Sequence, residues 1–256
     1  MPAPSPLPPM PTFVIIGAQR CATRWLKVNL NKHPDIYVPP AELDFWNDPA
    51  KRARLTMNGY RRRFDGWDEE PITGEASPSY LFYDTFPFEL AEPAKAMWKQ
   101  VPDLRLIALV RDPVDRFESA IRHYVKNKSL PRDFDVFADW NDASLTDLRL
   151  IQQSQYGETL EPYHLRFGDQ LEVVFVEDIV DDAASVYRHV LRHVGASDDV
   201  VPPDVDRVLF STANSVAVPR LTADQRNLIR SIMIPSIEKL EKLTGRDLEH
   251  WKSPES

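Results

Sequence analysis

The feature that most constrains the fold is a short apolar run followed by a tight turn and a helical pattern. Residues 13–16 are apolar and largely β-branched, as in strands buried on both faces of a sheet. Gly17 ends this run, and a helical pattern begins within a few residues, around Trp25. The first N–H groups of a helix lack intrahelical acceptors and lie at the positive end of its dipole. The stretch therefore predicts a site where an anion can bind.

Basic side chains flank this turn. Arg20 and Arg24 lie on either side of the hydroxyl residue Thr23. Taken alone, the turn is also consistent with ordinary surface arginines. A second strand-to-helix turn with a basic residue, at Arg111, favours the anion site.

Strand and helix patterns alternate along the chain. Apolar strand patterns occur near residues 12–17, 72–76, 104–110 and 171–176. This alternation predicts one α/β domain with a central parallel sheet that helices cover on both faces. Ligands of such sheets bind beyond the carboxyl ends of the strands, and the basic turns follow two of those ends.

The connecting segments give further expectations. Helices are expected from Pro113 to about Lys128, over 182–193, and over 221–243 with a kink or interruption at Pro235. Residues 145–167 predict one or two helices with Gly157 at the joint. The proline-rich residues 1–11 predict a mobile arm ahead of a single domain over 12–256.

Composition limits the class of protein. The 256 residues carry a net charge of −8, which argues against a nucleic-acid partner. The single cysteine, Cys21, excludes an internal disulfide and fits a reducing compartment. Neither a secretory signal nor an apolar run of membrane-spanning length is evident, so we expect a cytoplasmic protein without a membrane partner.

The first turn differs from an ATP-binding P-loop. That motif needs a second glycine and a lysine before the hydroxyl residue, and residues 17–24 have neither. Cys21 and Ala22 are nevertheless small enough for an anion to approach the backbone. Cys21 is interpreted as a small turn residue rather than a nucleophile, because no histidine lies near it in the sequence.

The turn at 17–24 resembles the 5′-phosphosulfate loop of sulfotransferases that use 3′-phosphoadenosine 5′-phosphosulfate (PAPS). The resemblance is to the heparan-sulfate-type branch and its soluble bacterial relatives, whose pattern is roughly G-x-[RQ]-[KR]-[GA]-[GA]-T-[RT]. Thr23 and Arg24 match this pattern, and Arg20 takes the place of the usual lysine. The resemblance implies a single P-loop-NTPase-like α/β domain.

Residues 106–119 resemble the 3′-phosphate motif of the same family. That motif is a strand, then R-[DN]-P-x-x-R, then a serine one helical turn later. By resemblance, Arg111 and Ser119 hold the 3′-phosphate of the nucleotide. The alternative is that Asp112 and Pro113 merely cap a helix, with Arg116 paired to Asp112.

Three more segments extend the resemblance over residues 12–251. Residues 33–46 resemble H-P-x-I…K-E-x-H-F-F, whose glutamate is the general base, which assigns that role to Glu42. Residues 74–80 resemble G-E-K-[ST]-P-x-Y, and residues 235–251 resemble the closing P-x-N-x-x-L…G-R-D…W.

The resemblance therefore implies a sulfotransferase that uses PAPS as donor, releases 3′-phosphoadenosine 5′-phosphate (PAP), and needs no metal. Glu42 and Arg20 are the expected catalytic residues, with Arg20 acting by charge because arginine does not transfer a proton. The expected nucleotide-binding residues are Arg20, Cys21, Ala22, Thr23, Arg24, Trp25, Arg111, Ser119 and, in the loop at 211–220, Arg220.

Departures from the family pattern leave the acceptor open. Ala41, Asp44 and Ala76 replace a lysine, a histidine and a lysine, so the acceptors of the carbohydrate enzymes are not transferred to this chain. A small molecule, a sugar or a tyrosine side chain would fit, through a hydroxyl or an amine. Rivals of Glu42 as base are Asp44, Glu75 and His123.

Two other functions remain as alternatives. One is a P-loop-like kinase that acts on a small molecule with ATP, against which the absent Walker lysine counts. The other is a protein that binds PAP or PAPS without catalysis, as the replacements at 41, 44 and 76 would allow.

Overall fold

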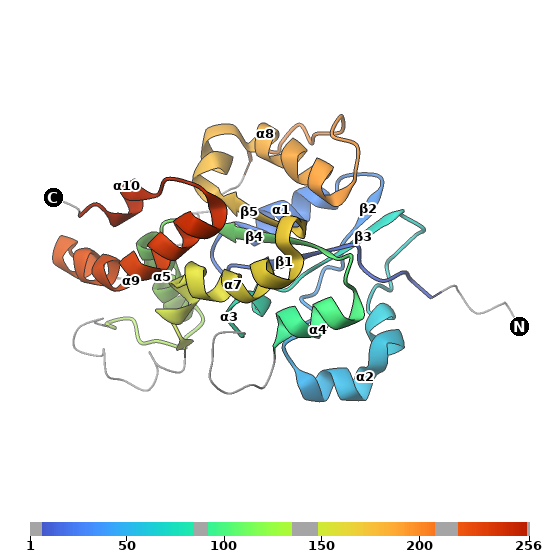
Figure 1. Cartoon of the computed structure of the whole chain (residues 1–256), viewed down its shortest axis with the longest axis horizontal. Helices are drawn as coiled ribbons and strands as arrows, with labels where there is room; N and C mark the ends of the chain where they lie inside the picture. The colour runs from blue at the N-terminus through green and yellow to red at the C-terminus, as the bar shows by residue number, and fades with distance from the viewer. Residues whose placement is uncertain (1–6, 84–91, 135–147, 208–219, 255–256) are drawn as a thin grey trace, which may run out of the picture.

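The structure is a computed structural model that describes residues 7–83, 92–134, 148–207 and 220–254. Within these ranges a single sheet has the strand order β2-β3-β1-β4-β5, and all its paired strands are parallel (Figure 1). The strands are β1 (Phe13–Gly17), β2 (Ile36–Tyr37), β3 (Ile72–Ala76), β4 (Arg105–Val110) and β5 (Leu171–Phe175). The four predicted strands are confirmed, and β2 is an addition in the extended segment around the prolines.

Helices cover both faces of the sheet. Those described are α1 (Thr23–Leu30), α2 (Pro49–Arg61), α3 (Tyr80–Tyr83), α4 (Pro93–Gln100), α5 (Pro113–Lys126), α7 (Tyr156–Phe167), α8 (Val176–Val194), α9 (Ala223–Thr244) and α10 (Glu249–Lys252). Short 3₁₀ turns lie at Gln152–Ser154 and Gly168–Gln170. α1 and α8 lie on one side of the sheet, and α3, α4 and α7 lie on the other (Figure 1). The predicted α/β class with a central parallel sheet is confirmed.

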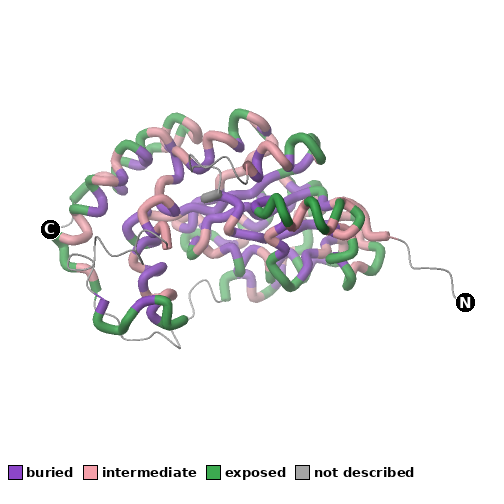
Figure 2. The backbone as a smooth tube through the Cα atoms, turned by 90° about the horizontal axis from the view of Figure 1, so that it is seen from below, coloured by how far each residue is buried: buried purple, intermediate pink, exposed green. Residues whose placement is uncertain are grey.

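The two central strands are the core of the molecule. Every residue of β1 is buried, as is every residue of β4 after Arg105. Buried positions follow the strands through the middle of the molecule, and exposed positions lie on the outer helices (Figure 2). The continuous apolar pattern of these strands is explained by helices packed on both faces.

Helix α8 begins earlier than predicted. It starts at Val176, directly after β5, rather than near Asp182. Asp182 nevertheless has non-helical dihedral angles, φ −151° and ψ 84°, and its carboxylate accepts a hydrogen bond from the Ser185 amide at 2.9 Å. Asp182 therefore does cap a helical segment, but the cap marks a kink within α8 rather than the start of the helix.

Gly157 is not a joint between helices. The break between the turn at Gln152–Ser154 and α7 falls at Gln155, and Gly157 lies inside the first turn of α7. A glycine is required at this position because α7 packs closely on α9. A Cβ atom at this position would lie 2.5 Å from the Ser236 carbonyl oxygen and 2.6 Å from Cβ of Lys239. Helix α9 includes Pro235 as part of one element.

The amino-terminal segment contacts the domain as far as it is described. Arg61 donates hydrogen bonds to the carbonyl oxygens of Leu7 and Pro8, and Thr73 donates one to Met10. The predicted division into an arm over 1–11 and a domain over 12–256 stays a prediction. In the described parts of the chain, every helix is too short or too polar to cross a membrane.

The packing of α7 on α9 predicts that Gly157→Ala destabilises the protein. Alanine is about 1 kcal/mol better than glycine inside a helix, so an open site would gain stability. Here the added methyl meets a backbone carbonyl, and we expect a loss of roughly 1–3 kcal/mol in the free energy of unfolding. Urea denaturation measures this difference.

Gly59→Ala in α2 is the matched control. Its Cβ would lie 3.2 Å from Leu55, on the same helix, so we expect no comparable loss. Equal stability of the two variants would contradict the close α7–α9 contact.

Candidate functional site

The site lies where the carboxyl ends of β3, β1 and β4 meet. β1 is the middle strand of these three, and from it the chain passes to β2 on one side before returning to β4 on the other. Loops that leave neighbouring strands in opposite directions open a crevice at the edge of the sheet. The turn after Gly17, the loop after Ala76 and the turn after Val110 therefore come together at one edge (Figure 1).

The turn between β1 and α1 exposes backbone donors. Arg20 and Ala22 have left-handed backbone conformations, with φ of 69° and 60°. Ala22 is the N-cap of α1 and supplies no side-chain cap. Within the described residues, the Ala22, Thr23 and Arg24 amides have no acceptor, whereas the Cys21 amide donates to Ala18 at 3.2 Å. Three donors at a helix start are thus available to an anion.

Gly17 is required for this turn. A Cβ atom there would lie 2.6 Å from Cβ of Leu81 and 3.1 Å from the Pro78 carbonyl oxygen. The backbone after β1 therefore runs directly against the segment that follows β3. This contact fixes where the turn emerges from the sheet.

The structure brings the two predicted phosphate motifs together. Nε of Arg20 donates a hydrogen bond to Oγ of Ser119 at 3.2 Å, across 99 positions of sequence. Arg111, directly after β4, has a buried Nε that finds no hydrogen-bond partner among the described residues, and its Nη2 donates to the Asp115 carbonyl oxygen. An unpaired buried donor is costly, and an anion in the crevice is a suitable acceptor for it.

Positive charges gather here around Arg20. The pKa of Arg20 is lowered, first by loss of solvation and then by the positive charges of Arg111 and Arg122. Among the described residues, no carboxylate forms an ion pair with Arg20 or Arg111. A bound anion would offset the repulsion between these guanidinium groups. Arg122, which sequence reasoning missed, could have been found from its position three residues after Ser119 on the same helix.

The other predicted nucleotide-binding residues have different environments. Cys21 is buried, with Sγ 3.4 Å from the hydroxyl of Tyr156, and burial raises the pKa of its thiol. This environment keeps the thiol protonated, as expected for a structural cysteine. Thr23 is buried at the start of α1. Nε1 of Trp25 donates a hydrogen bond to the Val205 carbonyl oxygen at 2.6 Å.

Arg24 and Arg220 are both exposed. Arg24 projects from the first turn of α1, next to the free amides. Arg220 is the only part of the predicted loop at 211–220 that falls within the described residues. Their assignment to the nucleotide stays a prediction.

Arg116 does not pair with Asp112. It is fully buried and donates to Oγ of Ser154 at 2.6 Å, Oε1 of Gln153 at 2.9 Å and the Leu150 carbonyl oxygen at 2.7 Å. Asp112 instead caps α5, as predicted, by accepting from the Val114 and Asp115 amides. The second arginine of the motif is therefore a structural residue that ties α5 to the turn before α7.

The four candidate bases are in different environments. Glu42 is exposed, in the segment between β2 and α2, and its pKa is raised, first by loss of solvation and then by the negative charge of Asp44; Lys27 opposes this shift. Asp44 accepts a hydrogen bond from Ser79. Glu75 is fully buried beneath hydroxyl groups and cannot reach an acceptor molecule.

His123 lies one turn after Ser119 on α5. Its pKa is lowered by burial and then by the nearby charge of Arg20, and Nε2 lies 3.0 Å from the side-chain nitrogen of Asn127. The imidazole is therefore neutral near pH 7, and a neutral imidazole can accept a proton. Of the four candidates, Glu75 alone is fully buried; Asp44 and His123 are partly exposed, and Glu42 is exposed.

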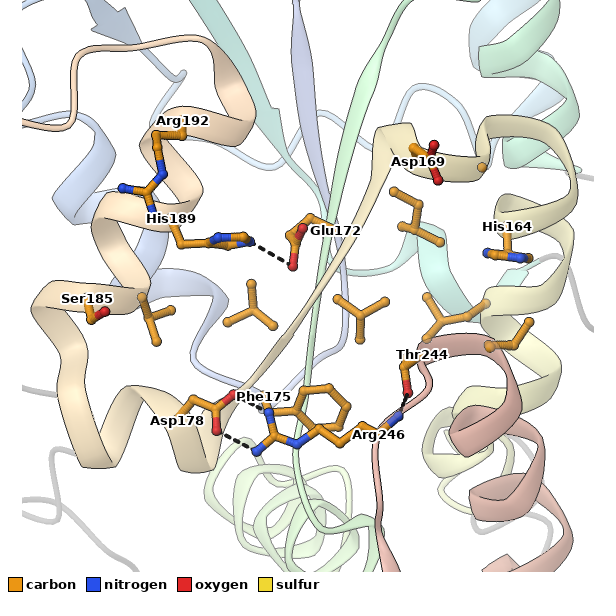
Figure 3. Close-up of a pocket in the computed structure, with 17 residues that line it drawn as sticks. His164, Asp169, Glu172, Phe175, Asp178, Ser185, His189, Arg192, Thr244 and Arg246 are labelled. Carbon is orange, nitrogen blue, oxygen red and sulfur yellow. Dashed lines mark hydrogen bonds and ion pairs between the residues drawn. The ribbon is translucent and has the colours of Figure 1, made fainter.

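A cavity of about 580 Å³ lies away from the predicted site residues. It follows β5 at the edge of the sheet, between α8 and the end of α7 (Figure 3). The Asp178–Arg246 and Glu172–His189 ion pairs lie in it (Figure 3). None of the predicted site residues lines this cavity. Within the described ranges, no cluster of histidine, cysteine and carboxylate side chains could hold a metal ion.

Comparison with known proteins gives one consistent family. The family model described as "Sulfotransferase domain" matches residues 10–220. Heparan sulfate glucosamine 3-O-sulfotransferase 3A1 of Mus musculus is 31% identical over 194 residues, which is 73% of this chain and 46% of that protein. The membrane-associated sulfotransferase kil1 of Dictyostelium discoideum is 27% identical over 130 residues, or 49% of this chain and 26% of that protein. The chain spans about half the length of the heparan sulfate relatives it matches.

Solved structures show the same fold. A sulfotransferase from Alicyclobacillus acidocaldarius superposes with a TM-score of 0.79 and 27% identity, covering 96% of this chain and 100% of that one. The sulfotransferase domain of the Synechococcus PCC 7002 olefin synthase superposes with a TM-score of 0.52 and 16% identity, covering 96% and 98%, which is a likeness of fold alone. These matches agree with the predicted P-loop-like arrangement of the sheet.

Proposed function

The chain belongs to the sulfotransferase domain family, and on this basis we propose that it transfers a sulfuryl group from PAPS to a hydroxyl or amine of an acceptor. The observation that carries the proposal is the contact between Arg20 and Ser119 near Arg111, whose Nε has no hydrogen-bond partner in the described parts of the chain. It brings the residues predicted to hold the two anionic ends of one nucleotide to a single sheet edge.

The donor would be held by groups from two neighbouring strands. The free amides of Ala22, Thr23 and Arg24, together with Arg20, suit the 5′-phosphosulfate. Arg111 and Ser119 suit the 3′-phosphate, because a guanidinium presents a planar set of donors to phosphate oxygens. PAPS supplies the sulfuryl group and leaves as PAP. The residues that surround it supply position and positive charge, as in phosphoryl transfer.

Arg20 and Glu42 have separate roles in this proposal. Arg20 stays charged and stabilises negative charge on the departing group, since arginine does not give up a proton near neutral pH. Glu42 takes the proton of the acceptor. Its raised pKa favours this role, because a base works best when its pKa approaches the working pH.

The acceptor is proposed as a sugar or another small molecule, with a tyrosine side chain as a further option. The names of the relatives in animals refer to a glucosamine of heparan sulfate. Near Glu42 this chain has another carboxylate, Asp44, and alanines at positions 41 and 76.

A nucleotide that carries a 3′-phosphate should stabilise the protein, whereas ATP with magnesium should not. At a PAP concentration 100 times Kd, binding contributes about 2.7 kcal/mol, which corresponds to a Tm increase of roughly 5–10 °C for a chain of this size. Arg111→Ala should abolish the increase, and Glu238→Gln, an exposed change in α9, should retain it. Stabilisation by ATP with magnesium, and not by PAP, would instead support the alternative function of a P-loop-like kinase.

Glu42→Gln should lower kcat by roughly 10²–10⁴-fold, the usual contribution of a general base. The stabilisation by PAP should be unchanged, because Glu42 is not among the groups proposed to hold the nucleotide. Transfer from radiolabelled PAPS to a panel of acceptors measures the rate. Full activity of this variant would remove Glu42 from the mechanism, and tight PAP binding without transfer by the wild type would support a non-catalytic protein.

The pH profile distinguishes Glu42 from His123. The acid limb of kcat/KM reports the pKa of the base in the free enzyme. Asp44 raises the pKa of Glu42 and Lys27 lowers it. Asp44→Asn should therefore move the limb to lower pH, and Lys27→Met should move it to higher pH. A limb that neither substitution moves would identify the base as His123, whose pKa depends on Arg20 and Lys126 instead.

A further inference from the structure

Glu75 is a buried carboxylate that the proposed reaction does not use. It lies on β3 with no exposed surface, and within the described residues it forms no ion pair. Three hydroxyl groups donate to it, those of Tyr60, Tyr80 and Ser77, the last at 2.7 Å. A buried charge without a cationic partner is costly and needs such a full set of donors.

Donation to Glu75 fixes the orientation of the three hydroxyl groups. A hydroxyl has one proton to donate, and an ionised carboxylate can only accept. Each of the three hydroxyl groups therefore directs its proton toward Glu75 and leaves its oxygen free to accept. The pKa of Glu75 is raised, first by loss of solvation, and the hydrogen bonds from its three hydroxyl donors oppose this rise because they stabilise the ionised carboxylate.

The freed oxygens accept from the segment that directly follows Glu42. Oγ of Ser77 accepts from the amides of Leu43 at 2.9 Å and Asp44 at 3.1 Å. The hydroxyl oxygen of Tyr80 accepts from the Phe45 amide at 2.8 Å. The Trp46 amide also donates to Tyr80, at 3.5 Å, so four successive backbone donors are each linked to Glu75 through a single hydroxyl group.

The third hydroxyl holds the end of the same segment. Nε1 of Trp46 donates to Tyr60 at 3.3 Å, and the Phe45 and Tyr60 rings stack with centroids 4.4 Å apart. Residues 43–46 form no helix or strand, so these contacts take the place of regular backbone pairing.

We propose that Glu75 is a positioning residue, which orients the hydroxyl groups of Ser77, Tyr80 and Tyr60 so that they hold residues 43–46 and thereby fix Glu42 beside the acceptor. The proposal rests on the proposed function for the role of Glu42. The link from Glu75 through these hydroxyl groups to the segment is a property of the fold and is testable without any substrate.

Glu75→Gln tests the polarity of the network. Glutamine has nearly the same shape, but its side-chain nitrogen donates where the carboxylate oxygen accepted. At least one hydroxyl must then turn its proton away and compete with a loop amide. Amide hydrogen exchange measured by mass spectrometry should become faster in peptides that cover residues 41–47, by roughly tenfold or more, a factor that corresponds to 1.4 kcal/mol. Exchange in β1 and β4 should stay as in the wild type.

Ser77→Ala provides a second variant in case Glu75→Gln folds poorly. It leaves the carboxylate in place and removes the acceptor of the Leu43 and Asp44 amides. We expect faster exchange in the same peptides. Glu238→Gln, an exposed change in α9, is the control that should alter neither exchange nor activity.

Activity measurements separate positioning from general stability. Glu75→Gln should lower kcat by roughly 10–100-fold through misplacement of the base, with the Kd for PAP unchanged. In a Glu42→Gln background the same substitution should have no further effect on kcat, since Glu75 acts through Glu42. Independent, multiplicative losses in the double variant would overturn the positioning role.

Unchanged exchange over residues 41–47 in both Glu75→Gln and Ser77→Ala would overturn the inference outright. Failure of the wild type to transfer from PAPS to any acceptor would instead contradict the proposed function. The exchange experiment would still decide whether Glu75 holds this segment.

Discussion

The pairing of β1 with β4 is the contact on which the candidate site depends. Phe13 lies opposite Arg105, and after an irregularity in the register Gly17 lies opposite Ala108. The Ala18 amide then donates to the Leu109 carbonyl oxygen at 2.8 Å. The register therefore sets the turn after β1 directly beside the turn after β4. Since helices pack on both faces of these strands, a shift of one residue would exchange side chains between the two faces and disrupt the packing on each.

This register concentrates positive charge at the N-terminus of α1, which has no side-chain cap. The charges of Arg111 and Arg122 both act unfavourably on Arg20, and the buried Nε of Arg111 has no acceptor within the described residues. Without a ligand this arrangement reduces stability, and proteins retain such features mainly where they bind something. The carboxylates Glu42 and Glu75 also lie in different environments. Loss of solvation raises the pKa of both, but Glu42 is exposed, whereas Glu75 is buried and accepts hydrogen bonds from the hydroxyl groups around it.

Much of the candidate site was predictable from local sequence. The Asp112 cap, the turn after Gly17 and the strand ends at residues 17 and 110 are set by neighbouring residues, and each is confirmed. The partner of Arg116 was not predictable. Its acceptors lie 34 to 38 positions away, so no local pattern distinguishes them from Asp112. The role of Gly157 likewise depends on α9, whose contacting residues are about 80 positions distant.

The sequence by itself determined the strands, their alternation with helices and the donors at each turn, because backbone sterics, capping and hydrophobic periodicity act over a few residues. Only the tertiary structure decided which of these donors meet. The hydrogen bond from Arg20 to Ser119 spans 99 positions, and the link from Glu75 through Ser77 to the Leu43 amide spans 32. Such contacts follow from strand order and register. These are set by the packing of the whole core, which distributes its constraint over residues far apart in the chain.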